Sequence, residues 1–292
     1  MRPYFEKMPA FGKPMKENRI ARTQESRAKL EAIEAEIAAA KKAVEEVGIP
    51  TAKINERGGL TVWQRLEYLV DPGTWQPLHS LYNPADNEEG TTNVVDGLGK
   101  IGGRWAVIIG FDNKVLAGAW IAGQPDNILR ITNLAKRLHI PLVWLVNCSG
   151  VKLPDQEKFY ADRRGSGAPF FRHAELEQAG IPVLAGIYGT NPAGGGYQAI
   201  SPTILIAHKD ANIAVGGVGI VSGMSPQGGF DVAGLEQLIA MTRNMKDKPP
   251  GSASTHYDST GFFTRVCDEE KGVLDGIKEY MGMIPAYDPK FF

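Results

Sequence analysis

Residues 181–200 read IPVLAGIYGTNPAGGGYQAI, and this stretch says more about the fold than any other part of the sequence. Its first half is an apolar run of strand length, and its second half is a glycine-rich turn that opens a helix. A buried strand that turns directly into a helix is typical of α/β proteins with parallel sheets. Glycine at such a turn lets a ligand approach the backbone closely, because no Cβ atom intervenes.

Residues 140–151, IPLVWLVNCSGV, have a similar form, in which a buried strand is followed by a turn of small residues. Both turns lie at the C-terminal ends of their predicted strands, where open α/β folds bind ligands. One backbone N–H group from each turn would form an oxyanion hole. For either turn alone, an ordinary strand-to-helix connection is the competing interpretation.

The flanking sequence predicts alternating strands and helices. Residues 94–111 predict a β-hairpin with a turn at Gly102–Gly103. Strand-like runs at 114–122 and 204–208 alternate with a helix near 125–138. This order of elements indicates an α/β architecture with crossover connections.

The longest predicted helix covers residues 17–47, which are rich in Ala, Glu and Lys and are followed by Gly48. Its apolar residues recur at intervals of three, four and seven, so one face is expected to pack, as an outer helix or at a subunit contact. These residues are Leu30, Ile33, Ile37 and Val44. Shorter helices are predicted at 60–70 and 273–287, and a mobile connection at 246–255.

The composition is that of a folded protein that does not attract polyanions. The chain has 292 residues, 43% of them hydrophobic, and a formal net charge of -1, which supports a sizeable core and no nucleic-acid partner. Two cysteines, Cys148 and Cys267, cannot form a disulfide framework, so a reducing compartment is expected. Glycine is in excess, with 34 residues, about 12% against an average near 7%.

Several common active-site patterns do not occur. The sequence has no P-loop and no Gly-x-Ser-x-Gly elbow. Its five histidines are scattered and lack zinc-binding spacing, so no metal site is expected. Cys148 follows a buried strand, and we interpret it as a packing residue rather than a nucleophile.

Four spaced motifs resemble the biotin-dependent carboxyltransferase family. They are LTVWQRLEYLVDPGTW at 60–75, VVDGLGKIGGRWAVIIGFD at 94–112, KVLAGAWIAGQPDNILRITNLAKRLHIPLVWLVNCSGV at 114–151 and GIYGTNPAGGGYQAISP at 186–202. The resemblance extends over residues 55–290 and is greatest to the glutaconyl-CoA decarboxylases of the family. It implies a crotonase-type (ClpP-like) superhelix of ββα units, preceded by a long N-terminal helix.

The resemblance also implies a division of the chain. Residues 1–54 would form a helical extension, and residues 55–292 the N-terminal, acyl-CoA-binding domain of a carboxyltransferase. Family members carry a second half that binds biotin, which this chain is expected to lack. The family's active site forms between the first half of one subunit and the second half of another, so the chain would hold half of a site.

The resemblance implies that this chain binds glutaconyl-CoA and transfers its distal carboxyl group to protein-bound biotin, giving crotonyl-CoA. By resemblance, the backbone N–H groups of Val151 and Gly195 would hold the thioester oxygen, and Gly194 and Gly196 would shape its approach. The other expected substrate contacts are Gly150, Ala117, Gly118, Ala119, Ala193, Tyr197, Arg130 and Lys136, of which the last two would lie near the CoA phosphates.

One departure from the family is the run Ser149-Gly150-Val151-Lys152, where many relatives have Ser-Gly-Gly-Ala. A backbone N–H group does not depend on the side chain, so Val151 can still serve as a donor. The departure is therefore expected to change the acyl pocket.

The expected partners follow from the same resemblance. No cofactor would be bound covalently, because biotin is carried by another subunit. The other partners would be a membrane decarboxylase subunit of a sodium-pumping complex in glutamate fermentation, and further copies of the chain. The chain would be cytoplasmic, and at most peripheral to the inner membrane through a partner.

Three other functions stay open. Carboxylases of acetyl-, propionyl- or methylcrotonyl-CoA use the same thioester machinery in the opposite direction. A hydratase or isomerase of the crotonase fold would need an acid or base such as Glu157, Glu175 or Glu177. A non-catalytic fragment would bind CoA and contact other subunits without turnover.

Overall fold

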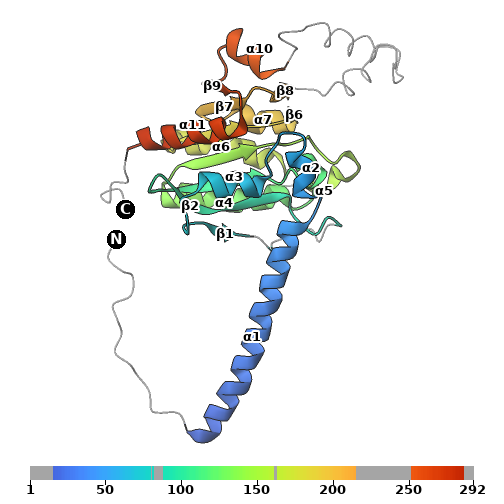
Figure 1. Cartoon of the computed structure of the whole chain (residues 1–292), viewed down its shortest axis with the longest axis vertical. Coiled ribbons are helices and arrows are strands. Elements are labelled where there is room, and N and C mark those ends of the chain that lie inside the picture. The colour runs from blue at the N-terminus through green and yellow to red at the C-terminus, as the bar shows by residue number, and fades with distance from the viewer. Residues whose placement is uncertain (1–15, 80, 82–87, 161–162, 215–250, 286–292) are drawn as a thin grey trace.

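A seven-stranded sheet lies at the centre of the part of the chain that the structure describes (Figure 1). The computed structural model describes residues 16–79, 81, 88–160, 163–214 and 251–285. The strands are β1 (Gln76–Leu78), β2 (Val94–Ile101), β3 (Arg104–Phe111), β4 (Leu142–Val146), β5 (Val183–Ile187), β6 (Thr190–Pro192), β7 (Ile204–His208), β8 (Asn212–Ala214) and β9 (Arg265–Cys267).

Helices connect and cover the strands. They are α1 (Glu17–Glu46), α2 (Thr51–Asn55), α3 (Val62–Leu69), α4 (Gln124–Leu138), α5 (Glu157–Tyr160), α6 (Gly167–Gln178), α7 (Gly194–Ile200), α10 (Ala253–Asp258) and α11 (Glu270–Met283), with two 3-10 turns, η1 (Leu116–Gly118) and η2 (Leu153–Asp155). The helices predicted at 17–47, 60–70 and 125–138 are confirmed, and the helix predicted at 273–287 is confirmed as far as Met283, whereas residues 286–287 lie outside the described part of the chain. The connection predicted at 246–255 lies outside the described residues as far as residue 250, and its last three residues, 253–255, are not a loop but begin α10.

The strand order in the main sheet is β1-β2-β3-β4-β5-β7-β9. The first three strands are antiparallel neighbours, and β2 and β3 form the predicted hairpin. From β3 to β9 every pair of neighbours is parallel. Parallel neighbours need crossover connections, which the helices supply. The α/β class predicted from the sequence is therefore confirmed.

Alternate residues of each strand face two separate cores. In β3, Val107 and Ile109 join the core that α4 and α6 cover, whereas Ala106 and Ile108 join the core beneath α3 and α11. All four side chains are fully buried. A sheet that is covered on both faces explains why its strands read as continuous apolar runs in the sequence.

A second layer of short strands follows the parallel strands of the main sheet. β6 pairs with β8 in parallel, and Trp120 forms a single parallel bridge with Val151. A strand or bridge of this second layer thus follows each of β3, β4, β5 and β7 along the chain. After β3, β4 and β5, the next major element is a helix. This repeat of strand, short strand and helix is the ββα unit that the resemblance implies.

The run at 114–122 is not the strand that the sequence predicts. The chain forms η1 here, because Leu116, Ala117 and Gly118 have φ angles of 48°, 51° and 77°. Positive φ angles are incompatible with a strand. The bend brings Gly118 against the next loop, and a Cβ atom on Gly118 would lie only 1.8 Å from the backbone oxygen of Asn147.

α1 extends away from the rest of the molecule and joins it at its C-terminal end (Figure 1). None of its residues is buried by the described parts of the chain, so the expected packing face of this helix is uncovered there. Among the helices of the described residues, none combines the length and the apolar character that crossing a membrane requires.

A buried ion pair joins α3 to α11. Arg65 and Glu270 share two hydrogen bonds, from Nε to Oε2 at 2.8 Å and from Nη2 to Oε1 at 2.9 Å. Their side chains are only 1% and 9% exposed. The guanidinium group also lies 3.8 Å from the ring centre of Tyr188, which directly follows β5. The pair therefore fixes both helices against the strand that leads to the glycine-rich turn.

Replacement of Glu270 with alanine should lower the free energy of unfolding by about 3–5 kcal/mol, because the charge of Arg65 would stay buried without its partner. Urea denaturation of the two proteins measures this difference. The matched control is Glu279→Ala, which breaks the half-exposed pair of Arg265 with α11 and should cost less than about 1 kcal/mol. Equal losses in the two variants would contradict the role assigned to the buried pair.

Candidate active site

The two predicted glycine turns touch each other. We call residues 147–152 the first turn and residues 189–196 the second turn; they follow β4 and β5, which are adjacent and parallel. A Cβ atom on Gly195 would lie 2.6 Å from the backbone oxygen of Cys148, and one on Gly150 would lie 3.3 Å from a side-chain carbon of the second turn. A side chain at position 195 would therefore push the two turns apart.

Asn191 connects the two turns through its side-chain amide. Its Oδ1 accepts a hydrogen bond from the backbone N–H of Cys148 at 2.8 Å. Its Nδ2 donates to the backbone oxygens of Tyr188 and Gly189, at 2.9 and 3.2 Å, and lies 3.4 Å from the oxygen of Asn212. The side chain is fully buried. One residue thereby sets the separation of the first and second turns.

The bridge between Trp120 and Val151 fixes the direction of the Val151 N–H group. The N–H of Trp120 donates to the oxygen of Gly150 at 2.7 Å, and the N–H of Lys152 donates to the oxygen of Trp120 at 2.9 Å. In a parallel bridge of this kind, the N–H and C=O groups of the central residue point to the opposite side. The N–H of Val151 is therefore directed away from Trp120 and is not used in the bridge.

The second turn contains consecutive backbone N–H groups that come before the first intrahelical hydrogen bond of α7. The first intrahelical bond of α7 runs from the N–H of Tyr197 to the oxygen of Ala193 at 3.0 Å. The N–H groups of Gly194, Gly195 and Gly196 precede this bond. Ala193 has φ 47° and ψ -117°, a conformation that a residue with a Cβ atom rarely adopts. The surrounding contacts thus hold the second turn in one strained shape.

The loop that contains Ala117 lies against the first turn. The N–H of Ser149 donates to the oxygen of Ala117 at 3.1 Å, and the Ser149 hydroxyl donates to the oxygen of Leu116 at 2.8 Å. The oxygen of Ala119 accepts a hydrogen bond from the buried Asn93 at 2.7 Å. The structure therefore brings this predicted contact loop to the site, with the carbonyl oxygens of Leu116, Ala117 and Ala119 already hydrogen-bonded.

Aromatic rings border both turns. The rings of Tyr197 and Phe170 meet edge to face with their centres 5.5 Å apart, and Phe170 stacks on Trp120 at 5.7 Å. Phe170 also lies 3.9 Å from the position that a Cβ atom on Gly194 would occupy. These rings offer an apolar surface for an acyl chain next to the backbone donors.

Cys148 belongs to the core, as the sequence interpretation expects, and so does His173. Burial raises the pKa of the Cys148 thiol to about 12, so the thiolate does not form at neutral pH. Burial lowers the pKa of His173 to about 4, and its Nε2 is 2.9 Å from the amide oxygen of Gln198. His173 also stacks on Trp144. The thiol is therefore not an activated nucleophile, and the imidazole is a neutral packing group.

The structure separates Arg130 from Lys136, although both are expected near the CoA phosphates. Lys136 pairs with Glu175 of α6 at 3.0 Å. Glu175 is also paired with Arg172. Lys136 therefore takes part in the contact between α4 and α6, and the structure does not bring it together with Arg130; its expected role near the CoA phosphates stays a prediction.

Arg130 lines a cavity of about 390 Å³ on the other side of α4. Arg137 and Arg164 line the same cavity, so three guanidinium groups gather there. Asp126 forms ion pairs with Arg130, at 2.9 Å, and with Arg164. The lining residues are Leu78, His79, Arg130, Asn133, Leu134, Arg137 and Arg164. This cavity has the charge that a phosphate group requires.

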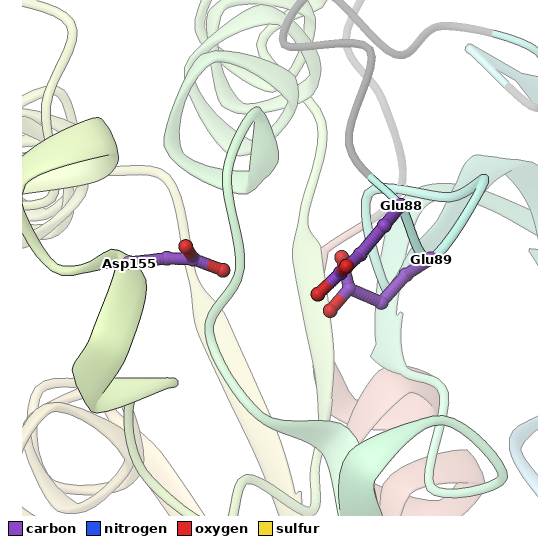
Figure 2. Close-up of side chains that lie close together, drawn as sticks. All are labelled: Glu88, Glu89 and Asp155. Atoms are coloured by element: carbon purple, nitrogen blue, oxygen red, sulfur yellow. The ribbon is translucent and has the colours of Figure 1, made fainter.

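Three carboxylates meet beside the first turn. Figure 2 shows Glu88, Glu89 and Asp155 pointing toward one another, and their oxygens are close enough to surround a cation. Lys152 lies among them, because its Nζ forms ion pairs with all three carboxylates, at 2.8 Å for Asp155. Its ammonium group supplies the positive charge, so we assign an ion-pair cluster that ties residues 88–89 to the first turn.

Sequence reasoning missed three contributors to this region. Asn191 is visible as a polar residue before a glycine run, but its bond to Cys148 spans 43 positions of the chain. Phe170 lies on a helix whose sequence gives no signal of a site. Arg164 reaches the cavity from the segment before α6, and only the three-dimensional structure places it next to α4.

Comparison with known proteins gives related sequences. The family model described as Carboxyl transferase domain matches residues 53–292. The glutaconyl-CoA decarboxylase subunit alpha of Acidaminococcus fermentans is 52% identical over 290 residues, which is 99% of this chain and 49% of that protein. The biotin-dependent 3-methylcrotonyl-coenzyme A carboxylase beta1 subunit of Mycobacterium tuberculosis is 26% identical, over 75% of this chain and 39% of that protein. The chain thus spans about half the length of the first relative and less of the second.

Solved structures share the fold. The beta subunit of geranyl-CoA carboxylase from P. aeruginosa superimposes with a TM-score of 0.71 at 20% identity, covering 96% of this chain and 51% of that one. Transcarboxylase 12S gives a TM-score of 0.69 at 20% identity, covering 86% and 47%. The expected carboxyltransferase fold of the crotonase type is therefore confirmed, and the chain belongs to the carboxyl transferase domain family.

Proposed function

We propose that the chain forms the acyl-CoA half of a biotin-dependent carboxyltransferase site that decarboxylates glutaconyl-CoA. The contact between the two glycine turns, with Asn191 hydrogen-bonded to both, carries this proposal. The 52% identity to a glutaconyl-CoA decarboxylase subunit supports the choice of acyl group. Biotin carried by another subunit would accept the carboxyl group, and no cofactor would be bound covalently.

In this mechanism the N–H groups of Val151 and Gly195 hold the thioester oxygen. The bond between the γ-carbon and the distal carboxyl group breaks, and its electron pair spreads through the conjugated chain to that oxygen. The two donors stabilise the negative charge, and loss of one would raise the barrier by about 3 kcal/mol. Protonation of the dienolate then gives crotonyl-CoA. This route needs neither a thiolate nor a strong side-chain base.

The acyl chain would lie along the aromatic rings beside the turns. Phe170 and Tyr197 offer the apolar surface, and Phe170 lies directly next to the second turn. Gly150, Gly194 and Gly196 admit the thioester to the backbone, because none of them carries a Cβ atom. The strained conformation of the neighbouring alanine supports a turn that is shaped for a ligand.

The CoA phosphates would meet the arginine cavity beside α4. Arg130, Arg137 and Arg164 line it together, and Asp126 pairs with Arg130 and Arg164. Guanidinium groups bind phosphate oxygens in pairs of hydrogen bonds, which suits the diphosphate of CoA. Lys136 is not among the residues that line this cavity and pairs with Glu175 of α6.

The proposed assembly needs further polypeptides. Residues 1–54 would be the helical extension and residues 55–292 the acyl-CoA domain, while a second carboxyltransferase half would bind the biotin. A biotin carrier, a membrane decarboxylase subunit of a sodium-pumping complex and other copies of the chain would be the partners. The chain would then act in the cytoplasm next to the membrane.

Hydratase or isomerase activity has less support. Glu175, one of the three glutamates considered for it, is held in ion pairs by α4 and α6 side chains. Glu157 and Glu177 are exposed. A general acid or base must reach the substrate within hydrogen-bond distance, and these positions give no indication of such a role.

Gly195→Ala should lower kcat for glutaconyl-CoA decarboxylation about 10²–10³-fold, because the new Cβ atom meets the Cys148 oxygen and displaces one donor. Crotonyl-CoA formation in the assembled enzyme, with its biotin carrier, measures this loss. Gly282→Ala in α11 is the matched control, since a Cβ atom there meets nothing within 4 Å. The oxyanion role fails if Gly195→Ala keeps normal activity, or if the control loses as much.

Asn191→Asp should make activity depend on pH. A carboxylate at this position can accept the hydrogen bond from the Cys148 N–H group but cannot donate one to the Tyr188 oxygen. The protonated acid can make both hydrogen bonds. Burial raises the pKa of such a carboxyl group, so activity should be retained at low pH and fall as the pH rises through that pKa. Initial rates from pH 5 to 8 test this. A profile parallel to that of the wild type, or one identical to that of Asn191→Ala, would refute the positioning role.

The thiol of Cys148 should resist alkylation in the folded protein. Iodoacetamide at pH 8 should modify the half-buried Cys267 much faster than Cys148, whose burial keeps it protonated. Peptide mass spectrometry identifies the modified residue, and the same reaction in urea, where both thiols should react, is the control. Rapid modification of native Cys148 would show that it is a reactive thiol rather than a core residue.

A further inference from the structure

α1 carries an apolar stripe that the described parts of the chain do not cover. Leu30, Ile33 and Ile37 are 60%, 50% and 42% exposed. Among the residues that the structure describes, α1 is held to the rest of the chain near its C-terminal end, where Lys114 donates a hydrogen bond to the backbone oxygen of Glu45. The rest of the helix projects into solvent (Figure 1). Three large aliphatic side chains exposed on one stripe indicate a contact surface.

The stripe follows the spacing of a coiled coil. Its positions alternate strictly by three and four residues, so they correspond to the a and d positions of a heptad repeat. In order they are Leu30, Ile33, Ile37, Ala40 and Val44, of which Val44 is half-buried near the end of α1. This spacing places them along a narrow seam that suits another helix lying nearly parallel to α1.

The charged residues beside the stripe match a second copy of the same helix. With Leu30 at position a, the g positions hold Lys29 and Glu36, and the e positions of the following heptads hold Glu34 and Lys41. In a parallel, in-register pair, each g residue faces the next e residue of the partner helix. Along the apolar part of α1, Lys29 then faces Glu34 and Glu36 faces Lys41, so both contacts there are between opposite charges, whereas Arg22 would face Arg27 in the preceding heptad.

We propose that α1 pairs with α1 of a second copy of this chain in a parallel two-stranded coiled coil. Parallel pairing places both main bodies at the same end of the coiled coil, where each α1 enters its own fold. The proposal does not depend on the proposed reaction, because it rests on the seam of Leu30, Ile33 and Ile37 and on the charges beside it.

An introduced cysteine at the seam tests the parallel alignment. In Leu30→Cys, the two thiols of a pair would face each other, and mild oxidation should give a covalent dimer on a non-reducing gel. Ala35→Cys, on the opposite face of α1, is the matched control and should link at least about tenfold more slowly. The wild-type chain controls for Cys148 and Cys267. Linking of Leu30→Cys no faster than Ala35→Cys would overturn the proposal.

A charge reversal tests the pairing independently of oxidation. Glu36 has no charged residue three or four positions away in α1, so Glu36→Lys should leave the single helix unchanged. It should slow the oxidative linking of the Leu30→Cys chain about tenfold, because the lysine introduced in each copy then faces Lys41 of the other copy. Adding Lys41→Glu should restore the wild-type rate within about twofold. Equal rates for Glu36→Lys alone and with Lys41→Glu would contradict the charge pairing.

Discussion

The side-chain amide of Asn191 is the contact on which the candidate site depends. It is hydrogen-bonded to the first turn through Cys148 and to the end of β5 through Tyr188. Backbone donors have fixed directions, so two N–H groups from separate loops can serve one oxygen only if the loops keep their separation. Because the amide is buried, each lost bond would leave an unsatisfied polar group at a cost of about 1–3 kcal/mol. The separation of the turns is thereby built into the fold.

The same strand end is held from the other face of the sheet. The backbone oxygen of Tyr188 accepts a hydrogen bond from the side chain of Asn191. The ring centre of Tyr188 lies 3.8 Å from the guanidinium group of Arg65. Arg65 is in turn paired with Glu270 beneath the sheet. The chain thus leaves β5 between two buried polar contacts, one on each side, and enters the second turn in a fixed direction. This arrangement explains how Ala193 can be kept at a positive φ angle.

The strands and the glycine turns were predictable because apolar runs and glycines are local signals. The contact between the turns could be expected as well, since parallel neighbours end at the same side of a sheet. The bend at Ala117 could not, because it results from close packing against Asn147 of another segment. The different surroundings of Arg130 and Lys136 have a simpler reason. Arg137 lies seven positions from Arg130 and shares its helix face, whereas Lys136 does not.

The central claim is that the N–H groups of Val151 and Gly195 hold the thioester oxygen of the substrate. A crystal structure of the chain with glutaconyl-CoA tests it most directly, because it locates that oxygen relative to both turns. The account predicts the oxygen within about 3 Å of both backbone nitrogens, with the acyl chain beside Phe170. A thioester oxygen that lies far from both nitrogens, in a complex with the CoA fully bound, would contradict it.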